Sequence, residues 1–198
     1  MAYHHGRLRE TLIDEAADAI DERGVDALSL RDLARRAGVS HAAPAHHFGD
    51  RSGLLTAIAA DGFERLADAL AAAGADFVEA GVAYVRFAND EPGRFAVMFR
   101  TELLRPGDPA LEAARERAGA FLATGAGRAL GDARADRLAA WSIVHGFATL
   151  WNSGAIDAAP DERPDALARE VAARLVPDTR SAAEPRDAED PGASRRDR

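Results

Sequence analysis

Apolar residues recur along this chain at the spacing of an α-helix, and almost nowhere at the spacing of a β-strand. Leu8, Leu12, Ala16 and Ile20 stand four residues apart and would form one stripe along a helix. β-branched residues are sparse, and no long alternating stretch is flanked by hairpin turns. The pattern therefore predicts an all-α fold of about nine helices.

Composition excludes several kinds of chemistry. The 198-residue chain has no cysteine, which rules out disulfides and thiolate sites for catalysis or metal binding. No apolar run reaches the roughly 18 residues of a membrane span, and the N-terminus lacks the pattern of a signal peptide. The adjacent His4 and His5 have no partner cluster at metal-ligand spacing. We therefore expect a cytoplasmic protein with no membrane contact, no cofactor and no metal site.

The charge balance limits how the chain could bind a nucleic acid. Its net charge is −8, which argues against binding along a broad surface. Residues 1–51 contain seven arginines against nine carboxylates. Any contact with DNA would have to come from a small, locally positive face.

Capping residues divide the N-terminal part into short helices. Ser29 followed by Asp32 has the form of a capping box, and Gly38 ends that helix after two turns. Ser40 is the predicted cap of a third helix that contains Pro44. With this cap one internal hydrogen bond would be lost at Pro44, and with a cap one residue later none would be lost. A proline is tolerated there because the first four N–H groups of a helix have no intrahelical acceptor.

Two short helices joined by a tight turn with glycine form a helix-turn-helix, whose second helix enters the major groove of DNA. His41, Ala42 and Ala43 are small or polar and stand at the start of that helix, where base edges would be met. Ser29 can act as a helix cap, a phosphate contact or both. Arg31 lies nearer the start of its helix than Arg35 and is the better candidate for a phosphate contact.

The stretch LSLRDLARRAGVSHAAPAHHFGDRSGLL, residues 28–55, resembles the DNA-binding region of the TetR/AcrR family of bacterial transcriptional regulators. Ala45 departs from the usual tyrosine, a frequent contact to the DNA backbone, so His46 or Tyr3 would have to replace it. Arg51 stands where the family has lysine and keeps the charge for a phosphate. The matching residues are Ser29, Ala34, Ala37, Gly38, Val39, Ser40, His47, Phe48 and Leu54. The DNA-binding candidates are Tyr3, His4, Ser29, Arg31, Ser40, His41, Ala42, Ala43, His46, His47 and Arg51.

The rest of the chain, to about residue 175, resembles this family more loosely. The segment WSIVHG at 141–146, together with Tyr3-His4-His5-Gly6, is similar to a subset with a Trp-x-x-x-His-Gly signature in the ligand domain. The resemblance implies a small-molecule pocket and a dimer formed by the last two long helices. The ligand-binding candidates are Phe63, Tyr84, Phe87, Met98, Phe99, Leu103, Phe121, Trp141 and His145. The dimer candidates are Val144, Phe147, Trp151, Leu167 and Val171.

Two interpretations of His145 stay open: a satisfied buried histidine, or the polar anchor of the pocket. The resemblance divides the chain into a DNA-binding domain at residues 1–52 and a ligand-binding and dimerisation domain at residues 53–176. Residues 177–198 are rich in Pro, Asp, Glu and Arg and have almost nothing to bury, which predicts a disordered tail. A helix from about residue 51 links the two domains.

The function implied is that of a ligand-responsive transcriptional repressor, released by a small molecule from double-stranded operator DNA that it binds as a homodimer. The alternative is a ligand-binding or adaptor protein with an inactive DNA head. An all-helical enzyme is least favoured, since the chain lacks motifs such as G-x-S-x-G, a phosphate loop or HExxH.

Overall fold

The computed structural model describes the backbone of residues 2–129, 134–159 and 161–174, and the side chains of the same ranges except 2–6 and 122–129. These ranges contain nine α-helices, two short 3₁₀ segments and no strand, which confirms the all-α prediction. The predicted disordered tail lies outside the described residues. The elements are α1 (Ala2–Arg23), η1 (Val25–Ala27), α2 (Leu30–Arg36), α3 (Ala42–Phe48), α4 (Arg51–Ala73), α5 (Phe77–Asp90), α6 (Pro92–Met98), η2 (Thr101–Leu103), α7 (Pro109–Ala129), α8 (Arg134–Asn152) and α9 (Pro164–Ala173).

Several helices begin where their capping residues predict. The Ser29 hydroxyl accepts a hydrogen bond from the backbone N–H of Asp32 at 3.1 Å, which opens α2. Asp50 accepts one from the N–H of Gly53 at 2.8 Å at the start of α4. Asp108 accepts two from the first turn of α7, each at 3.1 Å. These side chains satisfy N–H groups that a helix start otherwise leaves without acceptors.

Two predicted boundaries were wrong. The N-cap of α3 is His41 and not Ser40, whose carbonyl instead accepts from the N–H of Ala43 at 3.0 Å. Pro44 is then the third helical residue, and no intrahelical hydrogen bond is lost there. The apolar residues from Phe95 to Leu104, which follow Pro92, predict a single helix, but α6 ends at Met98. The segment that follows is tied back onto α4 by side-chain hydrogen bonds, described below.

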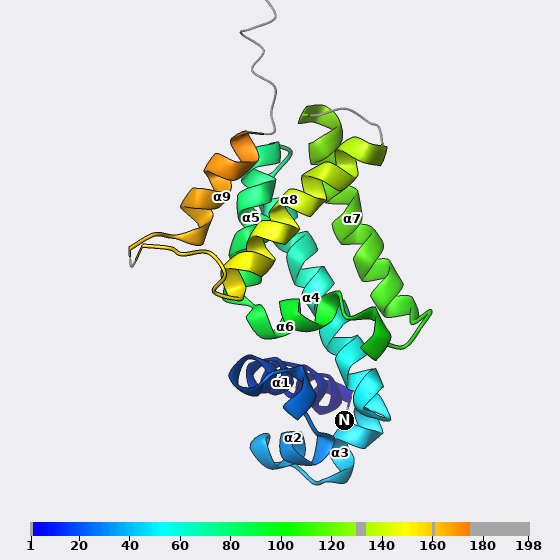
Figure 1. The fold of residues 1–198 in the computed structure, drawn as a ribbon. Coiled ribbons are helices and arrows are strands. Elements are labelled where there is room, and N and C mark those ends of the chain that lie inside the picture. Colours follow the sequence, from blue (N-terminus) through cyan, green and yellow to red (C-terminus); the bar gives the residue numbers. More distant parts are fainter. Residues whose placement is uncertain (1, 130–133, 160, 175–198) are drawn as a thin grey trace, which may run out of the picture.

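The helices form a small head and a larger body that share α4. Figure 1 shows α1, α2 and α3 together at one end, with α4 running from them into the group formed by α5 to α9. Within the body α4 packs against α7, and α5 packs against α9. None of the described helices is long and apolar enough to cross a membrane.

One continuous hydrophobic core runs through head and body. It extends from Leu12 in α1 along Leu54, Ile58 and Leu66 of α4 to Ala168 in α9. The first four of these side chains are essentially inaccessible to solvent, and burying each contributes about 1.5–3 kcal/mol. Because α4 belongs to both parts, a displacement of this helix in the body is carried into the head.

Candidate functional site

The helix α3 is held in the head by one face and exposes the other. Pro44 and Phe48 stand one turn apart and are both buried, so the proline that the sequence merely tolerates is an anchor of the helix. The opposite face exposes Ala42, Ala45 and His46. An exposed short helix fixed on a packed underside is the arrangement that a helix-turn-helix uses to enter a major groove.

The predicted DNA-binding residues differ in how free their side chains are. Ser40 and His41 are exposed at the start of α3, and Arg31 is exposed on α2 with no ion pair to another described residue. Ser29 is engaged locally, because its hydroxyl also donates to the Asp32 carboxylate at 2.9 Å. The remaining candidates on α3, Ala43 and His47, are half-buried. The side chains of Tyr3 and His4 lie outside the described residues.

Arg51 does not have the role that its position in the sequence suggests. Its guanidinium donates to the carbonyl of Leu28 at 3.1 Å and to that of Val25 at 2.7 Å. These carbonyls lie in the turn between α1 and α2, so Arg51 joins the start of α4 to that turn. The prediction that Arg51 contacts a phosphate is corrected: the structure turns this side chain into the head.

The acidic excess of the head is largely held in ion pairs. Arg36 binds Glu15 at 2.7 Å and Glu22 at 2.6 and 2.8 Å, and its hydrogen bond lowers the pKa of the Glu22 carboxyl. Two further carboxylates, Asp14 and Asp50, pair with arginines that lie outside residues 1–51. The last two pairs bring in positive charges that the count over residues 1–51 leaves out, and so reduce the net negative charge of the head.

An aromatic cavity of about 670 Å³ lies in the body between α4, α5, α6, α7 and α8. This volume falls within the usual range for small-molecule sites, roughly 300–1,000 Å³. Six of the nine predicted ligand-binding residues are on its wall. The described residues that line it are Phe63, Leu66, Tyr84, Met98, Phe99, Thr101, Arg115, Ala118, Gly119, Arg134, Arg137, Leu138, Trp141 and His145.

His145 stands at the centre of the aromatic side chains. Its ring centroid lies 4.5 Å from that of Phe99 and 5.5 Å from that of Trp141, which confirms that Trp141 and His145 share one face of α8. Phe95, which the sequence analysis did not select, is 5.4 Å away. Edge-on and tilted contacts of this kind fix the orientation of the imidazole.

A hydrogen bond of 2.9 Å joins the Tyr84 hydroxyl to Nδ1 of His145. Tyr84 is fully buried, so its O–H would lack an acceptor if it did not donate to this nitrogen. The neutral imidazole then carries its proton on Nε2. Burial lowers the pKa of His145 below its ordinary value of 6.5, which favours this neutral form at neutral pH.

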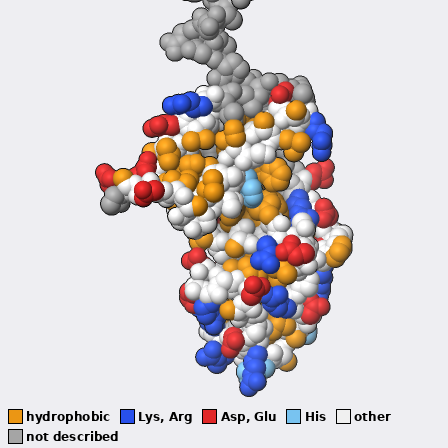
Figure 2. Space-filling view, in the orientation of Figure 1, with side chains coloured by type: hydrophobic (Ala, Val, Ile, Leu, Met, Phe, Trp, Pro, Cys, Tyr) orange, Lys and Arg blue, Asp and Glu red, His pale blue; other side chains and the backbone are white. Residues whose placement is uncertain are grey.

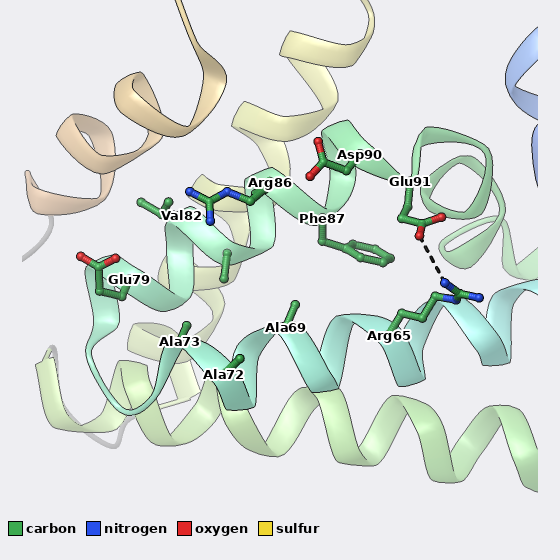
Figure 3. Close-up of a pocket in the computed structure, with 11 residues that line it drawn as sticks. Arg65, Ala69, Ala72, Ala73, Glu79, Val82, Arg86, Phe87, Asp90 and Glu91 are labelled. Atoms are coloured by element: carbon green, nitrogen blue, oxygen red, sulfur yellow. Dashed lines mark hydrogen bonds and ion pairs between the residues drawn. The ribbon is translucent and has the colours of Figure 1, made fainter.

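A second hollow, the alanine groove, lies between α4 and α5 and has a volume of about 480 Å³. Figure 3 shows Ala69, Ala72 and Ala73 along α4, with Phe87 projecting from α5 toward that helix. Phe87 is thus in this groove and not in the aromatic cavity. The rim is charged and largely paired within the chain, including a 3.4 Å contact between Arg65 and Glu91, so the groove offers fewer free groups to a ligand.

Two protein-family models match the chain. The model for "Bacterial regulatory proteins, tetR family" matches residues 12–58, and the model for "Tetracyclin repressor-like, C-terminal domain" matches residues 77–175. The chain belongs to the TetR family. The two matches fall on the head with the start of α4, and on the helical body, in the order of the described structure.

Individual relatives agree with this assignment. HTH-type transcriptional regulator BetI from Klebsiella pneumoniae (strain 342) is 44% identical over 62 residues, and the match spans about a third of each chain, 31% of this one and 32% of BetI. A protein of unknown function from Rhodococcus sp. RHA1 is 35% identical with a TM-score of 0.70, over 88% of this chain and 97% of its own. The multidrug binding protein EbrR complexed with imidazole is 27% identical with a TM-score of 0.53, over 85% and 89%.

In this TetR-family protein the wall of the cavity continues directly into a contact with the head. Phe99 and Thr101 line the cavity, and the chain then reaches Arg105, whose guanidinium donates to the Phe48 carbonyl at 3.0 Å and to Asp50 at 2.9 Å. The Arg105 N–H also donates to the Thr56 hydroxyl at 2.9 Å. The segment between α6 and α7 therefore holds the junction of α3 and α4.

A second contact joins the head to the body through α6. The guanidinium of Arg94 is only 5% exposed and binds Asp14 of α1, Asp61 of α4 at 2.7 Å and Glu91 at 2.7 Å. Arg65 reaches the same three carboxylates at 2.8–3.4 Å. Three helices thus meet in one network of charges, and periodicity in the sequence gave no sign of it.

The predicted dimer residues of α8 need correction. Val144 and Phe147 are buried within the single chain, because α8 turns this face onto α5 and α9. The fit is tight: a Cβ on Gly81 of α5 would lie 3.2 Å from Val144 and 3.3 Å from Ala172. Trp151, Leu167 and Val171 are half-buried and pack onto the same core.

Two predicted ligand-binding residues lie beside the cavity and not on its wall. Leu103 and Phe121 are both half-buried and pack onto the hydrophobic core. The sequence analysis in turn missed the three arginines of the wall, because on a helix an arginine ordinarily faces solvent. For two of them the spacing relative to Trp141 was the available signal, because Arg134, Arg137 and Trp141 follow at intervals of three and four residues.

Proposed function

We propose that this protein is a ligand-responsive, DNA-binding transcriptional repressor that acts as a homodimer. The observation that carries the proposal is the exposed outer face of α3, which the buried Pro44 and Phe48 hold in place within a TetR-family head. Ser40 and His41 at the start of α3, with Arg31 on α2, would contact the operator. Helix N-termini and arginines are suited to phosphate groups.

The cavity would bind the effector, and the segment after α6 would carry its effect to the head. A ligand that packs against Phe99 and Thr101 would shift the chain that leads to Arg105, and so the α3–α4 junction. The ligand would then favour a head position that fits the operator poorly, which is a population shift between two states. The relative EbrR, complexed with imidazole, supports the idea that such a body holds a small molecule.

The homodimer would form on the outward face of α8. Leu150 is 51% exposed, and Figure 2 shows hydrophobic side chains gathered on the part of the surface that α8 crosses. A Cβ on Gly146 would meet nothing within 4 Å in the single chain, which leaves room for a partner helix to approach. Trp151, with the two α9 candidates, would border this face.

We also propose that the chain belongs to the subset with the Trp-x-x-x-His-Gly signature, and that the cavity binds its ligand without transforming it. The tilted ring contact between Trp141 and His145 supports the first point. Tyr84 is the hydrogen-bonding partner of His145, and the described wall supplies no carboxylate to act with it as a general acid or base. This arrangement suits a polar anchor for a ligand.

The DNA interaction is tested by fluorescence-polarisation titration on the DNA upstream of the protein's own gene. We expect sub-micromolar, salt-dependent binding. Arg31→Ala should weaken binding to all sequences and reduce the salt slope by about one, whereas His41→Ala should reduce the preference for the operator. Arg163→Ala, on an exposed side chain of the body, is the matched control and should bind as the wild type does.

Arg51 is unsuitable for this test, because its removal would break the two hydrogen bonds to the turn before α2. No preference for the upstream DNA over random DNA at physiological salt would contradict the proposal. If the protein binds a ligand in the cavity but no DNA, the alternative of a ligand-binding or adaptor protein with an inactive head would be favoured instead.

A further inference from the structure

The charged side chains on the wall of the aromatic cavity have one sign. Three of the described lining residues are arginines, Arg115 of α7 with Arg134 and Arg137 of α8, and none of the described lining residues is an aspartate or glutamate. The chain as a whole has the opposite balance, with 33 carboxylates against 25 arginines. A wall with only positive charges is therefore contrary to the composition of the protein.

One of these arginines is fixed directly over an aromatic wall residue. The guanidinium of Arg115 lies 5.6 Å from the centre of the Phe63 ring, and it also binds Glu112 at 3.1 Å on its own helix. Arg134 is exposed and forms no ion pair with another described residue. An apolar ligand in contact with Phe63 would thus have the Arg115 guanidinium beside it.

The rest of the described wall is mainly apolar or aromatic, and its further polar side chains are His145 and two hydroxyl groups. Phe63, Phe99 and Trp141 line the cavity with their rings, and the Phe99 ring contacts the other two at centroid distances of 5.5 and 6.0 Å. The neutral His145, whose Nδ1 is engaged by Tyr84, carries a proton on Nε2 and can donate but not accept there. The strongly polar groups of the described wall are therefore hydrogen-bond donors or cations, apart from two hydroxyls. These are the hydroxyl of Thr101 and that of Tyr84, which is already hydrogen-bonded to His145.

We propose that the effector is an apolar organic anion, with a hydrophobic and partly aromatic body and a carboxylate or similar group directed at the arginines. Guanidinium groups match the geometry of such anions and hold them by charge-assisted hydrogen bonds. A cationic ligand would meet the guanidinium of Arg134, which forms no ion pair with another described residue, and would find no carboxylate on the described wall. The inference rests on the proposed function in one respect only, that the bound anion acts as the effector.

The test uses three probes of similar shape and different charge, with the full-length protein and no DNA. They are 2-naphthoate, the neutral 2-naphthamide and the cation 2-naphthylmethylammonium, each titrated by isothermal calorimetry. We expect 2-naphthoate to bind at least about tenfold more tightly than the other two, which corresponds to about 1.4 kcal/mol. Equal or tighter binding of the cation, or no binding of 2-naphthoate near millimolar concentration, would overturn the inference.

Variants assign the preference to the arginines. Arg134→Gln and Arg115→Gln should each weaken 2-naphthoate by about fivefold or more and leave 2-naphthamide unchanged. Arg134→Lys should retain most of the affinity, since it keeps the charge. Arg163→Gln, away from the cavity, is the control. If both cavity variants bind 2-naphthoate as the wild type does, the inference is wrong.

The DNA experiment fails independently of this one. A protein that binds 2-naphthoate through Arg134 but no operator would refute the proposed function and leave the ligand class intact. A protein that binds its operator but prefers the cationic probe would refute the ligand class and leave the proposed DNA binding intact. Release of the operator by 2-naphthoate in the wild type, and not in Arg134→Gln, would join the two results.

Discussion

Head and body approach each other closely where α6 meets α1, and this contact depends on Gly93. A Cβ on Gly93 would stand 2.1 Å from the carbonyl oxygen of Ala17 and 3.2 Å from the backbone N of Asp21. Carbon and oxygen atoms ordinarily approach to about 3.3 Å at best. Gly93→Ala therefore requires α6 and α1 to separate by more than about 1 Å, since the contacted atoms are backbone and cannot rotate away.

The expected cost follows from that displacement. Forcing one extra carbon into a packed contact destabilises a protein by about 1–3 kcal/mol, and the gain in helix propensity returns at most about 0.5–1 kcal/mol. We expect a net loss of about 1–2 kcal/mol in the free energy of unfolding, or a fall of about 3–6 °C in Tm for a chain of this size. Separating α6 from α1 should also weaken the ion pair between Arg94 and Asp14.

The measurement is urea unfolding followed by circular dichroism, with Gly119→Ala as the matched control. Gly119 also lies in a helix, but a Cβ there would meet nothing within 4 Å. This control should be more stable than the wild type by about 0.5–1 kcal/mol. If Gly93→Ala raises the urea midpoint as the control does, the close contact between α6 and α1 is refuted.

Three further changes test separate parts of the structure. Ser29→Ala removes the cap of α2 and should cost about 1 kcal/mol in the free energy of unfolding, whereas Ser29→Asp should cost little; equal losses for both would contradict the capping role. Arg94→Met should cost about 2–3 kcal/mol by urea unfolding, less than a fully buried ion pair because Arg65 still reaches the same carboxylates; an unchanged midpoint would refute the importance of this network. Burial lowers the pKa of His145 in the folded protein, so as the pH falls His145 takes up a proton in the unfolded chain before it does so in the folded one. The stability that the neutral, buried His145 contributes is therefore complete above pH 6.5 and is lost as the pH falls through the folded-state pKa. The difference in the free energy of unfolding between wild type and His145→Asn should therefore shrink as the pH falls below 6.5. A difference that is constant with pH would argue against a buried neutral imidazole.

The features that could be predicted from the sequence are local ones. Ser29 caps α2 and Asp108 caps α7 because their acceptors are N–H groups two or three residues away. Trp141 and His145 share a face because a helix brings residues four apart together. The resemblance over residues 28–55 likewise depends on a short stretch, and it led to the family that the chain belongs to.

The errors arose where one face of a helix had more than one possible partner. Val144 and Phe147 form an apolar stripe that would suit a dimer or a core, and periodicity does not distinguish them; the tertiary structure buries them against α5 and α9. Arg51 was assigned to a phosphate by its place in the motif, yet carbonyls more than twenty residues earlier in the chain receive its hydrogen bonds. Phe87 is apolar and buried as expected, but in the groove beside α4.

The sequence by itself determined the helical class, most helix starts and the family of the head, because each depends on interactions between residues close in the chain. Only the tertiary structure decided what those helices bring together. It gathered three arginines and a polarised histidine around an apolar cavity, made Pro44 an anchor of α3, and joined Arg105 to the head. Such contacts link residues dozens of positions apart, and the spacing of side chains along one helix carries no information about which distant helix will cover them.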